Sequence, residues 1–317
     1  MPGSMTLIPS LITGSSGFIG GKILQPKDRA FVRRPSGLAN ECLGDMSDIR
    51  SLERACAGIE QVVHCAGYCH DYRGSSAERH HEVNYIGTTN LLEAAVSSGV
   101  QRFVYLSTVK AAGDPGGSCV DEEWKKAPET PYGISKRAAE QKVLEVGEAS
   151  GMHVVNLRLA MVYGRGGGGN MERMAQGIRA GWFPPLPQTN NLRSIVHIDD
   201  VISAVKLVLR SDKANRQTYI VSHPVPQSGR DIYDALRRAI KGENSAVNWS
   251  VPEPLFRFVG RVGDYIDLLK DGKFSLTSET VGKLLDSSCY SSGKISKELG
   301  WVARVDLKNG LSEMFCE

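Results

Sequence analysis

A glycine-rich segment directly after the first apolar run constrains this chain more than any other feature of its sequence. The run at residues 7–13 leads into Gly14-Ser15-Ser16-Gly17-Phe18-Ile19-Gly20, where a helical pattern opens. Glycines at such a junction allow a tight turn, let backbone N–H groups approach a diphosphate, and place its charge at a helix N-terminus. The pattern predicts a dinucleotide-binding loop whose contacts include Gly14, Ser16, Gly17, Phe18 and Ile19.

The rest of the first half alternates short apolar runs with helical patterns. We expect strands at residues 7–13, 29–32, 62–65, 102–107 and 154–159, and helices at 48–57, 82–98 and 131–150. Such alternation is typical of parallel β-α units with right-handed crossovers. The fold class is therefore α/β, with a doubly wound parallel (Rossmann) sheet. The first helix should be unusually short, because Pro26 follows Gly20 by only six residues.

The second half is mostly helical. The glycine-rich segment 164–169 predicts a hinge or exit loop, helices are expected at 199–209, 230–240, 254–268 and 278–285, and a strand at 218–221. We assign residues 5–163 to the dinucleotide-binding domain, with 191–222 returning to it. Residues 164–190 and 223–317 then form a smaller, mostly helical lobe that binds substrate over the carboxyl edge of the sheet.

Composition excludes several classes of protein. The net charge is only +3, from 38 basic and 35 acidic side chains, so no nucleic-acid partner is expected. No apolar stretch approaches the roughly 20 residues of a membrane span. The seven cysteines are odd in number and form no Cys-x-x-Cys pair, which favours reduced thiols in a cytoplasmic protein. Cys65 and Cys69 lie near His64 and His70, but this spacing matches no zinc signature, and we expect no metal.

A second motif carries catalytic chemistry. In Pro131-Tyr132-Gly133-Ile134-Ser135-Lys136, the tyrosine and lysine are four residues apart and share one helical face. A nearby ammonium favours the phenolate over the phenol, so Tyr132 can exchange a proton with a substrate oxygen. Lys136 can also hold a ribose. The hydroxyls of Ser107 and Thr108, at the end of an expected strand, can polarise the same substrate oxygen.

The end of the second expected strand selects the cofactor. An acid there binds the ribose 2′-hydroxyl of NAD, whereas arginine accommodates the 2′-phosphate of NADP. This chain has Arg33 and Arg34 and no acid at that point. Either arginine offers a fork that suits a phosphate, although a solvated basic pair would look the same in sequence. We expect NADP or NAD, with NADP slightly favoured.

Further motifs resemble those of one enzyme family across nearly the whole chain. They are Gly44-Asp45-Met46, His64-Cys65-Ala66-Gly67, Asn84 with 87–90, Tyr105-Leu106-Ser107-Thr108, the segment 193–201, Tyr290-Ser291-Ser292 and Glu298-Leu299-Gly300-Trp301. With the two motifs above, the chain resembles the extended short-chain dehydrogenase/reductase family, of the NAD-dependent epimerase/dehydratase type.

The resemblance implies roles for individual residues. Asp45 would bind the adenine amine and Met46 would flank its ring, Cys65-Ala66-Gly67 would line the cofactor, and Asn84 would anchor the cofactor region or hold a helix kink. Thr108, rather than Ser107, matches the catalytic hydroxyl beside Tyr132 and Lys136. On the substrate side, Arg193 and Asn170 match residues that contact a nucleotide-sugar diphosphate. His197 is expected to be a packed strand residue, and Asp200 a helix cap.

The resemblance also limits the reaction. Dehydratases of the family carry an Asp-Glu pair after the catalytic threonine, where this chain has Val109-Lys110. A second substrate arginine has no counterpart in residues 285–292. The favoured function is hydride transfer at C4 of a nucleotide-linked hexose, by 4-epimerisation or 4-keto reduction. The alternatives are an NADP-dependent ketone or alcohol reductase, including one that resembles 3β-hydroxysteroid enzymes, and, less favoured, a non-catalytic NADP sensor.

The family also implies a homodimer. Its members pair two long helices, here residues 82–98 and 131–150, into a bundle between two copies. Ala138, Ala139, Val143 and Leu144 make the second helix apolar enough that some of them should face outward.

Overall fold

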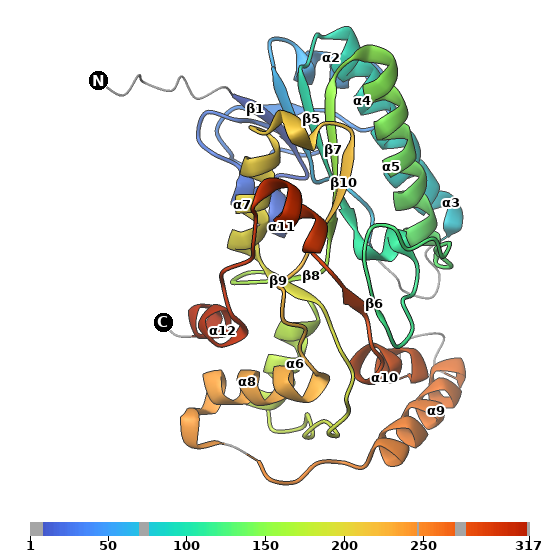
Figure 1. Ribbon diagram of the computed structural model, residues 1–317, viewed down its shortest axis with the longest axis vertical. Coiled ribbons are helices and arrows are strands. Elements are labelled where there is room, and N and C mark those ends of the chain that lie inside the picture. The colour runs from blue at the N-terminus through green and yellow to red at the C-terminus, as the bar shows by residue number, and fades with distance from the viewer. Residues whose placement is uncertain (1–8, 70–75, 246, 270–276, 316–317) are drawn as a thin grey trace.

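The computed structural model describes residues 9–69, 76–245, 247–269 and 277–315. Its centre is a seven-stranded sheet in the order β10-β7-β5-β4-β1-β2-β3, and every neighbouring pair in it is parallel (Figure 1). The doubly wound parallel sheet predicted from the sequence is confirmed. The strands are β1 (Ser10–Thr13), β2 (Arg29–Val32), β3 (Glu41–Leu43), β4 (Gln61–His64), β5 (Arg102–Thr108), β7 (His153–Leu159) and β10 (Gln217–Val221).

The strand order reverses at β1. The chain first builds β2 and β3 on one side of β1, then returns to add β4, β5, β7 and β10 on the other side. In open α/β sheets, ligands bind outside the carboxyl ends of the strands at such a switch point. This places the glycine-rich loop after β1 next to the loops that follow β4 and β5.

Helices cover both faces of the sheet (Figure 1). The face with α1 (Phe18–Ile23) and α7 (Ile198–Val208) buries residues such as Val63, Val104 and Val205. The opposite face packs Leu52, Leu91 and Val143 from α2 (Ile49–Cys56), α4 (Gly87–Ser97) and α5 (Pro131–Ser150). Before α4 lie α3 (Ala77–His80) and a π-helical turn, η1 (His81–Ile86), where one continuous helix was expected.

The first helix has only six residues, as the position of Pro26 suggested. Leu24 already leaves the helical region, with ψ 128°, and the chain reaches β2 at Arg29. A proline cannot supply the amide hydrogen that would continue the helix. One face of the sheet is therefore only partly covered beside α1.

The second lobe has its own core. It is built from α6 (Asn170–Arg179), α8 (Gly229–Lys241), α9 (Glu253–Leu269), α10 (Ser278–Leu285) and α12 (Leu307–Phe315), around buried side chains such as Tyr233 and Leu236. Sequence patterns missed α6, which follows the glycine-rich segment directly. Residues after this lobe return to the sheet: Ile295 in α11 (Gly293–Leu299) and Trp301 pack into the core on the α7 face. The division into two domains stays a prediction.

Two short sheets and three 3-10 turns complete the described chain. β6 (Cys119–Val120) pairs with β11 (Cys289–Tyr290), and β8 (Met161–Tyr163) pairs with β9 (Ile195–His197). The turns are η2 (Val109–Ala112), η3 (Asp212–Ala214) and η4 (Glu243–Ser245). Among the helices of the described residues, none has the length and apolar character needed to cross a bilayer.

A disulfide corrects the expectation that all cysteines are reduced. Cys119 in β6 and Cys289 in β11 are bonded across a sequence separation of 170 residues. The parallel pairing of the two strands brings these residues opposite each other, with their Cα atoms 4.5 Å apart. Cys42, Cys56, Cys65 and Cys69 are free thiols, and Cys316 lies outside the described residues.

The homodimer stays a prediction, and the packing of α5 reduces the number of apolar side chains that could form its interface. Ala139 and Val143 are buried within the single chain, so they cannot face a second copy. Ala138 and Leu144 are half-buried. Ile134, at the start of the same helix, is half exposed.

Candidate functional site

The loop after β1 is a cradle of bare backbone. Gly14 has φ +67°, and a Cβ there would lie 2.7 Å from the backbone nitrogen of Ala66. A Cβ on Gly20 would collide with the carbonyl oxygen of Gly14, which accepts a hydrogen bond from the Gly17 nitrogen at 2.9 Å. Ser16 and Gly17 are exposed at the turn. The loop therefore has the open backbone that a diphosphate needs, which fits a dinucleotide cofactor.

The glycine-rich segment after β8 lies beside this loop. A Cβ on Gly167 would come within 3.2 Å of the Phe18 ring, and Gly166 and Gly168 have φ values of +87° and +60°. The segment that was expected to be a hinge thus borders the cofactor loop and leads directly into α6, whose first residue, Asn170, is exposed.

The end of β4 is bonded to the same loop. The Ala66 nitrogen donates to Thr13 Oγ1 at 3.2 Å, and that oxygen lies 2.6 Å from His64 Nδ1. The other ring nitrogen of His64 lies 2.9 Å from Thr88 Oγ1. Burial, assisted by the charge of Lys136, lowers the pKa of His64 to about 3. His64 is thus a neutral link between three segments, with both nitrogens already bonded to hydroxyls.

The three expected catalytic residues come from two neighbouring elements. Thr108 ends β5, and Tyr132 and Lys136 lie in the first turns of α5, where the Thr130 side chain caps the helix by accepting from the Gly133 nitrogen at 3.1 Å. Lys136 Nζ donates to the Leu106 carbonyl oxygen at 2.8 Å and lies 4.1 Å from the centre of the Tyr105 ring.

Lys136 also reaches the cofactor side of the site. A Cβ on Gly67 would lie 3.8 Å from its Nζ atom. The lysine therefore stands between the carboxyl end of β5, where the expected catalytic hydroxyl lies, and the loop after β4. Its side chain is buried, which lowers its pKa to about 8 even though the carboxylate of Glu140 opposes that shift. Burial likewise raises the pKa of the Cys65 thiol to about 12, so Cys65 lines the site as a neutral group.

A buried ion pair beneath the expected catalytic residues was not predicted from the sequence. Glu140 accepts from Arg158 Nη2 at 2.7 Å and from the Ser107 hydroxyl at 2.6 Å, and both charged side chains are almost fully buried. Glu140 follows Lys136 by four residues, so the shared helical face could have revealed it. Its partner lies on β7, which only the folded sheet brings near. Ser107 thus bonds to Glu140, which leaves Thr108 as the hydroxyl at the strand end.

Asn84 acts as a connector rather than as an exposed cofactor ligand. Its side chain accepts from the Tyr68 nitrogen at 2.7 Å and donates to the Tyr68 carbonyl at 2.9 Å and to the Ser135 hydroxyl at 3.0 Å. It lies in the π-helical turn η1, a type of irregularity that is frequent at functional sites. Of its two implied roles, these bonds match the holding of a helix irregularity.

The adenine end of the expected site lies at the edges of β2 and β3. Arg33 and Arg34 are exposed directly after β2, and Asp45 follows β3. Hydrogen bonds from Ser47, with a smaller contribution from the charge of Arg33, hold the pKa of the Asp45 carboxyl below its usual range. The Met46 carbonyl accepts from Asn90 at 2.9 Å. These residues form a charged, open border to the cradle.

Arg193 occupies the region where the two lobes meet. Its Nη1 donates to the Asp286 carbonyl oxygen at 2.9 Å, and its backbone pairs with Gln227. Burial lowers its pKa while the charge of Asp286 opposes that change, so its environment is not that of a solvated surface ion pair. No hydrogen bond between described residues joins Arg193 to Asn170, the other expected substrate residue.

Two neighbouring expectations have different outcomes. His197 is a packed strand residue, as expected: it is buried, and its ring meets Tyr163 edge-on at 5.2 Å. It also caps α7 by accepting from the Asp199 nitrogen at 3.4 Å. The prediction that Asp200 is the cap is wrong. Its carboxylate accepts instead from the backbone nitrogens of Arg304 and Val305, at 2.9 and 3.0 Å, and so anchors the C-terminal segment.

Comparison with known proteins decides the family. Residues 10–222 match the profile of the NAD dependent epimerase/dehydratase family. The chain belongs to this family. It is 31% identical to the UDP-glucose 4-epimerase of Vibrio cholerae over 300 residues, covering 86% of this chain and 89% of that protein.

This epimerase/dehydratase family member also resembles proteins of other activities. It is 24% identical to the 2-alkyl-3-oxoalkanoate reductase of Stenotrophomonas maltophilia, over 96% of this chain and 97% of that one. A solved structure of MoeE5 in complex with UDP-glucose and NAD shares the fold, with a TM-score of 0.75, 22% identity and coverage of 97% of both chains. The family members thus share an NAD(P) cofactor and differ in substrate.

Proposed function

We propose that this enzyme transfers hydride at C4 of a nucleotide-linked hexose, in a 4-epimerisation or a 4-keto reduction, with Thr108, Tyr132 and Lys136 as its catalytic residues. The position of Lys136 carries the proposal. Its ammonium is bonded to the β5 backbone two residues before Thr108, and it lies beside Gly67 on the cofactor side. The proton-transfer group must reach the substrate oxygen, and the nicotinamide must reach the carbon that carries this oxygen. The contacts of Lys136 with β5 and with Gly67 bring the proton-transfer residues and the cofactor loop to one place.

Each residue has a distinct task. NAD(P), when bound in the glycine cradle, supplies the hydride acceptor and donor. Tyr132 moves a proton to or from the C4 oxygen, and the Thr108 hydroxyl hydrogen-bonds to that oxygen and polarises it. The ammonium of Lys136 favours the phenolate form of Tyr132. In a 4-epimerisation the 4-keto sugar turns over between two hydride transfers, whereas a reduction needs only one.

The residues after the catalytic threonine argue against 4,6-dehydration. Val109 is buried and Lys110 follows it in the turn η2, so no Asp-Glu pair is available there to remove water. The Vibrio cholerae relative, a UDP-glucose 4-epimerase, supports the sugar reading. Arg193 supplies a guanidinium fork suited to a diphosphate.

An apolar ketone or alcohol is the second candidate substrate. The Stenotrophomonas maltophilia relative supports it, and so does Trp182, which is 69% exposed in the substrate lobe. Phe183 is half-buried beside it, but Phe256 is buried in the lobe's core and is unavailable to a substrate. A sensor without turnover has no use for the Thr108, Tyr132 and Lys136 set.

Thermal melting distinguishes the two substrates. With NADP(H) or NAD(H) present, we expect millimolar uridine diphosphate to raise the melting temperature, and Arg193→Ala to abolish that shift while the cofactor shift remains. A hydrogen bond to a charged group contributes roughly 2–3 kcal/mol, which is enough to see in a melt. Arg261→Ala, which removes an exposed arginine of α9, is the matched control. If no nucleoside diphosphate shifts the melt and an apolar ketone does, the reductase candidate replaces the sugar proposal.

A further inference from the structure

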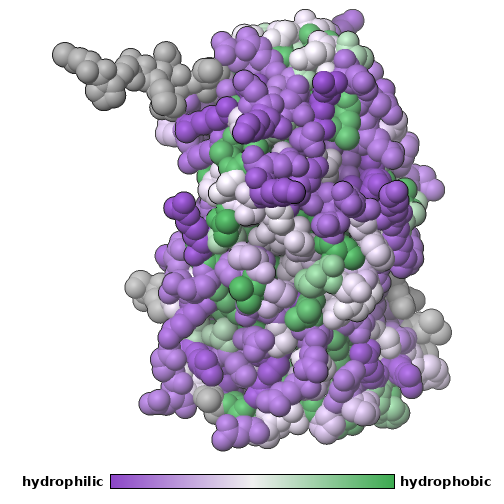
Figure 2. Space-filling model, viewed as in Figure 1, coloured by the Kyte–Doolittle hydropathy of each residue, from purple (hydrophilic) through white to green (hydrophobic). Residues whose placement is uncertain are grey.

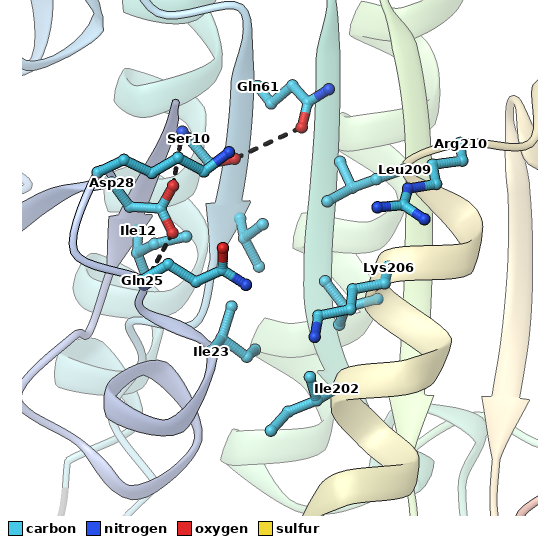
Figure 3. A pocket seen from close by; sticks show the side chains of 13 residues that line it. Ser10, Ile12, Ile23, Gln25, Asp28, Gln61, Ile202, Lys206, Leu209 and Arg210 are labelled. Atoms are coloured by element: carbon cyan, nitrogen blue, oxygen red, sulfur yellow. Dashed lines mark hydrogen bonds between the residues drawn. The ribbon is translucent and has the colours of Figure 1, made fainter. Parts of the chain in front are cut away.

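The early end of α1 leaves a hollow on the sheet beside α7. The helix stops at Ile23, whereas α7 continues alongside to Val208. Between them is an open cavity of about 240 Å³, lined by residues from β1, β4, α7 and the α1–β2 connection (Figure 3). It lies at the amino ends of β1 and β4, marked by Ser10 and Gln61, and so at the opposite edge of the sheet from the cofactor cradle.

The floor of this hollow is hydrocarbon. It consists of aliphatic side chains from the sheet, the end of α1 and the facing side of α7: Ile12, Ile23, Val63, Ile202, Val205 and Leu209. In an ordinary doubly wound fold, further turns of the first helix would cover such side chains. Here they line a cavity that a small apolar group can enter.

The opening carries positive charge. Lys206 on α7 and Arg210, in the turn that directly follows this helix, are both exposed, and Figure 3 shows both side chains projecting toward the α1 side. Lys27 lines the opposite wall. In the described part of the chain, no carboxylate forms an ion pair with Lys206 or Arg210.

Asp28, the one acid among the residues that line the hollow, bonds to the backbone of its own turn and of β1. Both oxygens of Asp28 are already bonded, one to the Ser10 nitrogen at 3.0 Å and the other to the Gln25 nitrogen at 2.9 Å (Figure 3). Asp28 therefore closes the α1–β2 turn. An anion at the opening would meet Lys206 and Arg210, and a hydrocarbon chain attached to it would meet the aliphatic floor.

We propose that this hollow binds a small amphiphilic anion, a medium-chain carboxylate, with its chain on the aliphatic floor and its head between Lys206 and Arg210. The volume is below the roughly 300–1,000 Å³ of drug-sized pockets, which excludes a long-chain fatty acid. The site is independent of the proposed hexose chemistry, because it lies at the far edge of the sheet. Its walls include the end of α1, the helix whose first residues border the cofactor cradle.

Titration calorimetry with sodium octanoate tests the site, and the methyl NMR signals of Ile12, Ile23 and Val205 report its location. We expect octanoate to bind at millimolar concentration or below and to shift these methyl signals. Acetate, which lacks the chain, and octanol, which lacks the charge, should each bind at least about tenfold more weakly. Saturating NAD should change the octanoate affinity by less than about twofold, since the two sites are separate.

The variant Lys206→Gln/Arg210→Gln should weaken octanoate about tenfold, the size of two ion pairs at a partly open site. Lys241→Gln, an exposed lysine of α8 in the other lobe, should leave the affinity unchanged. Ile202→Trp, which fills the floor of the hollow from α7, should abolish octanoate binding. This variant tests the site independently of Lys206→Gln/Arg210→Gln. The proposal is overturned if octanoate fails to bind at about 10 mM, a concentration that corresponds to a binding free energy of about −2.7 kcal/mol, if NAD displaces it, or if octanol binds as tightly.

Discussion

The central sheet and helix α9 of the smaller lobe differ in how completely they bury their side chains. Every residue of β7 is buried, and the charged groups beside the sheet, such as Lys136 and Glu140, are held by named partners. In the lobe, α9 turns Gly260 and Gly263 inward, whereas Leu255, Phe258 and Tyr265 are 51–67% exposed. Figure 2 shows hydrophobic surface among hydrophilic residues at the lower end of the molecule, where Figure 1 places this lobe.

This difference separates two kinds of task. Catalytic groups must be held in one geometry, and the buried contacts of the sheet provide that. A surface that recognises substrate or partner exposes apolar side chains before its ligand arrives. Changes at the buried contacts of the sheet should therefore impair chemistry or stability, and changes at the exposed apolar side chains of α9 should alter binding alone.

The largest effect expected on the sheet side is that of Tyr132→Phe. Loss of general acid/base help should lower kcat by about 10²-fold or more, while cofactor affinity stays nearly intact. Steady-state kinetics with a sugar nucleotide and cofactor titration by fluorescence measure the two quantities. Turnover near that of the wild type would refute the assigned role of Tyr132.

Glu140→Gln should cause the largest loss of stability. The change leaves the charge of Arg158 buried without its partner, which costs about 3–5 kcal/mol in comparable cases. Glu145→Gln, on the same helix, is the control. Glu145 is exposed and forms a surface ion pair with Lys142, with 3.6 Å between their charged atoms, so its loss should cost little. Denaturant unfolding measures both variants, and equal losses would show that burial at Glu140 does not matter.

The same substitution should move the pH profile. The carboxylate of Glu140 opposes the effect of burial and so raises the pKa of Lys136, which is about 8. Without this carboxylate, Lys136 should lose its proton at lower pH, and the alkaline fall in kcat/KM should shift to lower pH. An unchanged pH profile of kcat/KM would show that the charge of Lys136 does not contribute to catalysis.

Reducing the disulfide between β6 and β11 should lower the stability of the protein. The bridge closes a loop of 170 residues, and removing a constraint of this length costs about 2–5 kcal/mol in the unfolded-chain account. Cys119→Ser should therefore melt earlier than Cys69→Ser, which replaces an exposed free thiol. Dithiothreitol should lower the melting temperature of the wild type to that of Cys119→Ser. An identical melting temperature with and without reductant would contradict a disulfide in solution.

The smallest effect concerns cofactor choice at the edge of the sheet. If Arg33 and Arg34 hold a 2′-phosphate, NADPH should bind about tenfold more tightly than NADH, a difference of about 1.4 kcal/mol. Replacing both by alanine should remove this preference, whereas Arg50→Ala on α2 should preserve it. Equal affinities of the wild type for NADPH and NADH would show that Arg33 and Arg34 do not contact the cofactor.

Features that depend on neighbours in sequence were predictable. The glycine spacing after β1 identified the cradle because each glycine answers a local steric demand, a positive φ at Gly14 and close packing at Gly20. The spacing of Tyr132 and Lys136 placed both on α5, and the predicted helix at 131–150 has the observed bounds. Pro26 predicted the short first helix because it acts on the turn that contains it.

Features that join distant segments required the folded chain. β3 was missed because three half-exposed residues show no periodic pattern. The pairing of Glu140 with Arg158, the Cys119–Cys289 bridge and the bonds from Asp200 to residues 304 and 305 connect elements that only packing brings together. The hollow beside α7 follows the same rule. The sequence by itself determined the short helix, but the tertiary structure decided which side chains that helix leaves uncovered, because they come from strands and a helix up to about 200 residues away.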